Sequence, residues 1–260
     1  RKFTSTVSNR LSDRLIKNLN EHFDFSAEKW DLIRQNQYPY SLPQANFNLQ
    51  PNEIGIIKRL EGQETCDVII LFIDITGFSS KVTNWNSNEK LSDYLDKYYD
   101  KVFKIIYKHG GEVEKVIGDG IICVFGEPFL SLTKTELFIK ADLCARETIT
   151  ELFRTDKAVK IALCDGLVKY YKMKSEDYHE YTMIGQPLTD LFRLEAESED
   201  NAINFYGLNN IFQYPQLLRD CKFNKINNYN SWWELSTPKL INFKGVKFNQ
   251  RNYIKITERV

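Results

Sequence analysis

The feature that most constrains the fold is a run of six apolar residues, VIILFI at positions 68–73, followed directly by Asp74. An uninterrupted apolar run of this length is typical of a strand that is buried on both faces of a sheet. Gly77, three residues further on, marks the place where the chain turns away. The sequence therefore predicts a covered central strand with a carboxylate at the end where the chain leaves the sheet.

The segments after this strand alternate in a regular order. Residues 88–109 place apolar side chains on one helical face, and two glycines follow as a stop signal. Strand patterns at 112–117 and 121–126 flank the turn residues 118–120, which indicates a tight hairpin. A second helical pattern covers 133–153, and the strand VKIALCDG follows it. The order βαββαβ predicts an α+β fold of the ferredoxin-like type.

Segments at both ends extend this unit. The amphipathic stretch PLTDLFRLEAES, at 187–198, and several later strand patterns predict a C-terminal α/β extension. Residues 1–60 combine loosely spaced apolar residues with a stretch rich in Asn, Gln and Pro, which predicts a short helical appendage and a linker. We therefore divide the chain into residues 1–60 and a main domain at 61–260.

Charge and composition exclude several classes of function. The 260 residues carry 35 basic and 35 acidic side chains, so no net positive field attracts nucleic acid or an anionic membrane. No apolar run approaches the ~20 residues of a membrane span, and without a signal-peptide pattern we expect a cytoplasmic protein. The five cysteines are scattered and favour buried thiols, and the three histidines show no zinc-ligand or triad spacing. Any catalytic or metal-binding side chains are therefore expected to be carboxylates.

Two aspartates are expected to meet at one corner of the sheet. In a βαββαβ sheet the first strand lies antiparallel beside the third, so the end of the first strand, at Asp74, adjoins the hairpin tip at Asp119. Two neighbouring carboxylates repel each other unless a cation separates them, and a hard divalent ion such as Mg²⁺ prefers oxygen ligands. Taken singly, such an aspartate is commonly a turn former, and Lys115 and Arg193 have the spacing of ordinary surface charges.

Four segments together resemble the class III nucleotidyl cyclases, the family of adenylyl and guanylyl cyclase catalytic domains. They are FIDITGF at 72–78, GGEVEKVIGDGIICVFG at 110–126, EYTMIGQPLTDLFRLE at 180–195 and INFKGV at 241–246. The first two segments are specific to that family, and the third matches it in part. The resemblance covers roughly residues 66–258. It implies a metal-dependent cyclase that converts a ribonucleoside triphosphate into a 3′,5′-cyclic nucleotide and pyrophosphate.

The resemblance also implies a role for each matching position. Asp74 and Asp119, with the carbonyl of Ile75, would hold two Mg²⁺ or Mn²⁺ ions, and the turn that follows would line the triphosphate. Arg193 would stabilise charge on the α-phosphate and Lys244 would meet the terminal phosphates. The remaining assignments are the phosphate-lining residues Thr76, Gly77 and Phe78, the base-selecting residues Lys115 and Thr182, and the ribose-orienting position Thr189.

In that family the metal aspartates come from one subunit, and the arginine and base-selecting residues come from the other. The resemblance therefore implies a homodimer with two composite sites and an inactive monomer. Its partners would be a nucleoside triphosphate and a second copy of the chain, with no nucleic acid and no membrane.

The identity of the base remains open between two readings. Lys115 with Thr182 matches a pair found in bacterial adenylyl cyclases, which favours ATP and cyclic AMP. Thr189 stands where the family usually has an asparagine, and the helix around it is altered. The altered helix and the lack of a recognisable sensor domain resemble the stand-alone pyrimidine cyclases of bacterial antiphage defence. We therefore favour cyclic UMP or cyclic CMP.

Two further alternatives belong to other functional classes. A degenerate cyclase fold that binds a nucleotide without converting it is favoured by Thr189, whereas the retained aspartates and Arg193 argue against it. Polymerase-like nucleotidyl transfer would need a basic track for nucleic acid, and the neutral charge provides none.

Overall fold

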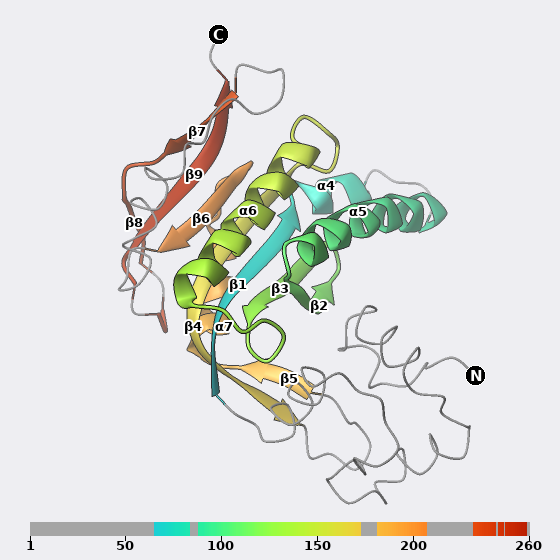
Figure 1. Ribbon diagram of the computed structural model, residues 1–260. Coiled ribbons are helices and arrows are strands. Elements are labelled where there is room, and N and C mark those ends of the chain that lie inside the picture. The colour runs from blue at the N-terminus through green and yellow to red at the C-terminus, as the bar shows by residue number, and fades with distance from the viewer. Residues whose placement is uncertain are drawn as a thin grey trace, which may run out of the picture.

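The computed structural model describes residues 65–83, 88–172, 181–206, 231–242, 244–246 and 248–258 (Figure 1). Its first half contains β1 (Thr65–Ile75), α4 (Phe78–Thr83), α5 (Asn88–Lys108), β2 (Glu112–Ile117), β3 (Gly120–Gly126), α6 (Lys134–Leu152) and β4 (Val159–Lys172). Its second half contains β5 (Tyr181–Ile184), α7 (Gln186–Ala196), β6 (Ala202–Tyr206), β7 (Ser231–Leu235), β8 (Lys239–Leu240) and β9 (Gln250–Glu258).

The described strands form one mixed sheet in the order β2-β3-β1-β4-β6-β9-β7, with β5 paired to β4 and β8 paired to β9. The pairs β2–β3, β3–β1 and β1–β4 are antiparallel, whereas β4 and β6 are parallel. The predicted βαββαβ arrangement is therefore confirmed. The C-terminal extension adds α7 and the strands that follow it. The proposed appendage at 1–60 lies outside the described residues.

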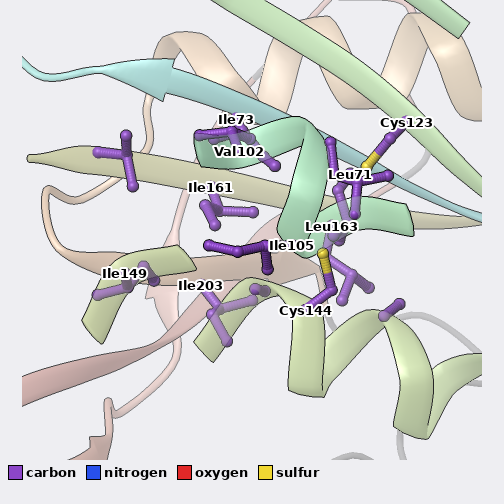
Figure 2. Close-up of a cluster of buried hydrophobic side chains, with 14 of the residues drawn as sticks. Leu71, Ile73, Val102, Ile105, Cys123, Cys144, Ile149, Ile161, Leu163 and Ile203 are labelled. Atoms are coloured by element: carbon purple, nitrogen blue, oxygen red, sulfur yellow. The ribbon is translucent and has the colours of Figure 1, made fainter. Parts of the chain in front are cut away.

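Helices cover both faces of the sheet, as the sequence of β1 requires. Along β1, Ile69, Leu71 and Ile73 pack into a core with α5 and α6, whereas Ile70 and Phe72 pack on the opposite face with α7. Figure 2 shows the first core, where residues of β1, β3, β4 and β6 meet residues of both long helices. Because residues on both faces of β1 are covered, the uninterrupted apolar run is explained.

The two long helices begin and end close to the predicted residues. α6 starts with a capping box in which Thr133 and Glu136 satisfy each other's backbone amides, which fixes its first turn. The buried residues of α5 are those of its predicted apolar face, including Tyr94, Tyr98 and Val102. Four cysteines are buried free thiols, as expected, and Cys221 lies outside the described residues.

Among the helices that the structure describes, none is long and apolar enough to cross a membrane.

Candidate active site

Asp74 and Asp119 lie at the same corner of the sheet. β1 and β3 are antiparallel with Ile73 opposite Ile121, so the end of β1 adjoins the tip of the β2–β3 hairpin. That tip is the two-residue turn Gly118–Asp119, and Gly118 has a φ of +60°, which suits glycine at this position. The backbone amide of Ile75 donates a hydrogen bond of 3.2 Å to Asp119 Oδ2. The expected meeting of the two aspartates is confirmed.

The two carboxyl groups perturb each other's ionisation. Burial raises the pKa of Asp74 to about 7, with further contributions from the negative charges of Asp119 and Glu195. Burial also raises the pKa of Asp119. Burial and neighbouring negative charges both favour the neutral form of a carboxyl group, and perturbed pKa values of this kind are common at functional sites.

The donor set fits a hard divalent cation. Two carboxylates and the carbonyl at the end of β1 offer oxygen atoms alone, which Mg²⁺ and Mn²⁺ prefer. Within the described ranges no cluster of three or more His, Cys, Asp or Glu side chains is arranged to hold a metal. Ions held by Asp74, Asp119 and Ile75 would therefore need further oxygen ligands from a triphosphate or from water.

Two tyrosines of α5 lie beneath this corner. The hydroxyl of Tyr99 donates a hydrogen bond to the carbonyl of Gly118, which ties the hairpin tip to the helix. Tyr98 is fully buried, and its hydroxyl has no hydrogen-bond partner among the described residues. Burial raises the pKa of Tyr98, and the charges of Asp74 and Asp119 raise it further, so this hydroxyl stays protonated near the pair.

Lys160 and Glu195 are members of the site that the sequence reasoning missed. Lys160 lies directly opposite Asp74 on β4, with its Nζ 3.6 Å from Asp74 Oδ2 and 2.8 Å from Glu195 Oε1. This lysine places a positive charge next to the aspartate pair, and its own pKa is raised by Glu195 and Asp74 against the effect of burial. The sequence feature that could have revealed Lys160 is its position within an otherwise apolar strand. Without the strand register, however, such a lysine resembles an ordinary surface residue.

The turn after β1 is open and anchored at both ends. The amide of Thr76 donates to the carbonyl of Ala158 at 2.8 Å, and its hydroxyl donates to Asp200 at 3.2 Å. Gly77 has a φ of +67°, and a β-carbon built there would meet no atom within 4 Å. Phe78 stacks on Tyr94 of α5 with the ring centroids 6.3 Å apart. This arrangement leaves open space over Gly77, and the assignment of the turn to phosphate binding stays a prediction.

Residues assigned to the base and to the α-phosphate lie elsewhere on the chain. Lys115 is exposed on β2, Thr182 is partly exposed on β5, and Thr189 and Arg193 are exposed on α7. Lys244 is exposed in a turn near the C-terminal strands. Within the described part of the chain, none of these five side chains forms a hydrogen bond or ion pair with Asp74 or Asp119. The structure therefore brings Asp74 and Asp119 together beside the turn at 76–78, and these five residues are not bonded to the pair.

The family described as the adenylate and guanylate cyclase catalytic domain matches residues 60–205. An uncharacterized protein of Mycobacterium tuberculosis, Rv1318c, is 28% identical over 138 residues, which are 53% of this chain and 25% of that protein. The chain thus spans about a quarter of the length of this relative.

Solved structures share the fold. The adenylyl cyclase CyaB from P. aeruginosa superposes with a TM-score of 0.58 at 20% identity, over 75% of this chain and 97% of that one. A non-canonical dimeric guanylyl cyclase domain of the RhoGC fusion protein from the aquatic fungus Blastocladiella emersonii gives a TM-score of 0.53 at 17% identity, over 74% and 97% of the two chains.

Proposed function

The chain belongs to the family of adenylate and guanylate cyclase catalytic domains, and on that premise we propose that it converts a ribonucleoside triphosphate into a 3′,5′-cyclic nucleotide and pyrophosphate. The observation that carries this proposal is the Asp74–Asp119 pair, in which oxygen ligands with raised pKa values meet at the end of β1. A structural ion pair would have supplied its own counter-charge, and Lys160 alone leaves the pKa of Asp74 at about 7.

The roles of the chain's own residues follow from their charges and positions. Asp74, Asp119 and the Ile75 carbonyl would hold two Mg²⁺ or Mn²⁺ ions, which would lower the pKa of the ribose 3′-hydroxyl and neutralise the pyrophosphate. The turn at Thr76, Gly77 and Phe78 lines the triphosphate, and Lys244 meets its terminal phosphates. Arg193 stabilises the charge that develops on the α-phosphate as the 3′-oxygen attacks and the bond to pyrophosphate breaks.

A second copy of the chain completes each site in this proposal. Arg193 is exposed and forms no hydrogen bond or ion pair with any described residue. Since Arg193 forms no hydrogen bond or ion pair with the aspartates of its own chain, the proposed homodimer supplies it across the interface, together with Lys115, Thr182 and Thr189. The fungal guanylyl cyclase domain of the same fold forms a non-canonical dimer, which supports association of two copies without defining their interface.

The base is proposed to be a pyrimidine, with UTP or CTP preferred over ATP. Lys115 offers hydrogen-bond donors alone, so it can bond a pyrimidine carbonyl as well as an adenine ring nitrogen, and Thr182 can donate or accept. GTP ranks last because Lys115 offers no acceptor for the guanine amino group. The cyclic UMP or cyclic CMP formed would serve as a second messenger in antiphage defence.

The test is a competition among equal concentrations of the four ribonucleoside triphosphates with Mn²⁺, read by mass spectrometry. We expect one dominant cyclic product and equimolar pyrophosphate from the wild-type protein, and no product from Asp119→Asn. Cyclic AMP as the dominant product would replace the pyrimidine preference and leave the cyclase proposal intact.

The non-catalytic alternative is motivated by Thr189 in place of the usual asparagine. Thermal stabilisation by Mn²⁺ and a triphosphate, with no cyclic product from any of the four, would establish that alternative in place of catalysis.

A further inference from the structure

Glu114 is a buried acidic residue that the proposed mechanism does not use. It lies in β2 next to Lys115 and is 8% exposed, although its neighbour is exposed to solvent. The pairing of β2 with β3 shifts at this point, because Val113 faces Cys123 and Lys115 faces Ile122. Glu114 is thus the extra residue of a β-bulge, a device that redirects side chains next to functional sites.

The carboxyl group of Glu114 reaches a second strand. Its Oε1 accepts a hydrogen bond of 3.1 Å from the backbone amide of Met183, a buried residue of β5 that follows Thr182. β2 lies at the edge of the sheet, whereas β5 pairs with β4, so the two strands are not neighbours in the sheet. The bond therefore links two elements that carry the proposed base-selecting residues one position away, Lys115 on β2 and Thr182 on β5.

The surroundings of this bond are buried and closely packed. Met183 pairs with Tyr170 of β4, and the Tyr170 ring makes an edge-to-face contact with Phe129 at 5.9 Å between centroids. Burial and then the negative charge of Glu114 raise the pKa of Tyr170, which places the carboxyl group close to this ring. A polar contact in such surroundings holds its partners in one geometry, because breaking it leaves buried polar groups unpaired.

From this geometry we infer that Glu114 is a positioning residue for base selection, which fixes the spacing between Lys115 and Thr182 so that both read one base. The inference rests on the proposed cyclase function and goes beyond it, because it gives Glu114 a role that acts through Lys115 and Thr182. A base-reading site discriminates by the placement of its polar groups, so a loosened link lowers discrimination among bases more than it lowers turnover.

The test compares kcat and KM for the four triphosphates, with Mn²⁺, in the wild-type protein and in four variants. Glu114→Met keeps the side-chain length and removes the acceptor, Glu114→Gln keeps an acceptor oxygen, and Glu114→Asp shortens the side chain by one methylene. The matched control, Glu112→Met, removes an equally buried carboxyl group of β2 that lies at a regular position opposite Val124. Thermal unfolding and the Mn²⁺-induced shift report on the fold and the metal site.

We expect Glu114→Met and Glu114→Asp to lower the ratio of kcat/KM between the best and the second-best triphosphate by about 10-fold, as for the loss of one polar contact to a base. The loss should appear mainly as a raised KM for the best substrate. Glu114→Gln and Glu112→Met should keep the wild-type ratio, even where Glu112→Met lowers the melting temperature.

Three outcomes overturn the inference while the cyclase function stands: a wild-type ratio in Glu114→Asp, an equal fall for all four triphosphates, or the same loss of discrimination in Glu112→Met. Glu114→Asp decides the matter where Glu114→Met does not fold. A wild-type protein that forms no cyclic product overturns the proposed function instead, and this inference falls with it.

Discussion

Asp74 holds a proton far more readily than an ordinary aspartate. Its carboxyl group is buried beside Asp119 and Glu195, which favours the neutral form, and Lys160 at 3.6 Å offsets part of this effect. The same lysine is 2.8 Å from Glu195, so its charge is shared between two carboxylates. The site therefore has an excess of negative charge near neutral pH that a divalent cation would compensate.

The pKa of Asp74 leads to a pH dependence with a definite sign. Its value in the folded protein, about 7, exceeds its ordinary value of 3.8, so the folded state binds the proton more tightly than the unfolded state. This group's contribution to stability is fully present below about pH 4 and is lost as the pH rises to about 7. In EDTA, the melting temperature of Asp74→Asn should therefore exceed that of the wild type by a margin that grows from pH 5 to pH 8.

Mn²⁺ should raise the wild-type melting temperature more at pH 8 than at pH 6, because binding must displace the proton from Asp74. Asp74→Asn should show little Mn²⁺-induced shift at either pH. A difference between the two proteins that stays constant over this pH range would contradict the assignment.

At the residue level, the sequence was sufficient for Asp74 and Asp119 but not for their neighbours. The two aspartates stand at a strand end and at a hairpin turn, and the order of elements alone places them side by side. Lys160 is recognised as part of the site only once the strand register sets it opposite Asp74. Glu195 is recognised only once the contact of α7 with β4 is known. Neither relation is encoded in local spacing, so both residues resembled surface charges.

Among the elements, α5 supports the hairpin that carries Asp119. Tyr99 donates its hydroxyl to the carbonyl of Gly118, and its ring stacks on Phe103 at 5.6 Å between centroids. The ring contact keeps the tyrosine in place, and the hydroxyl fixes the turn. This helix therefore limits the freedom of Asp119, the proposed metal ligand in the turn.

Tyr99→Phe should weaken Mn²⁺ binding by about 10-fold, the lower end of what the loss of an outer contact to a metal ligand costs. The ring contacts remain, so the melting temperature without metal should change little. Tyr94→Phe is the matched control, because Tyr94 lies on the same helix and donates to the carbonyl of Asp156 at 2.6 Å. Titration of Mn²⁺ by calorimetry checks both, and equal affinities for Tyr99→Phe and the wild type would refute the supporting role.

The order and the approximate bounds of the long elements could be predicted because each has a clear period and clear end signals. The short helix α4 was missed, since six residues do not establish a helical period. The bulge at Glu114 was missed as well, because a single extra residue leaves the alternation of β2 nearly unchanged. Both features follow from tertiary packing rather than from local preference.

At the scale of the whole molecule, one chain holds half of the proposed active site. It brings the aspartate pair together at the end of β1 and leaves Arg193 exposed on α7 without a partner among the described residues. The family resemblance predicted this division, whereas composition and periodicity did not. The central claim is therefore that two copies of the chain complete each other's sites.

The most direct test of this claim is complementation between Asp119→Asn, which lacks a complete aspartate pair, and Arg193→Ala. Each variant alone should form no cyclic nucleotide. When the two are co-expressed, half of the dimers are mixed and each mixed dimer has one intact site, so about a quarter of the wild-type activity should return. A co-expressed pair of Asp74→Asn and Asp119→Asn should stay inactive. The cyclic product of each co-expressed pair is measured by mass spectrometry. If the wild type is active and the pair of Asp119→Asn and Arg193→Ala regains no activity, the composite site is contradicted.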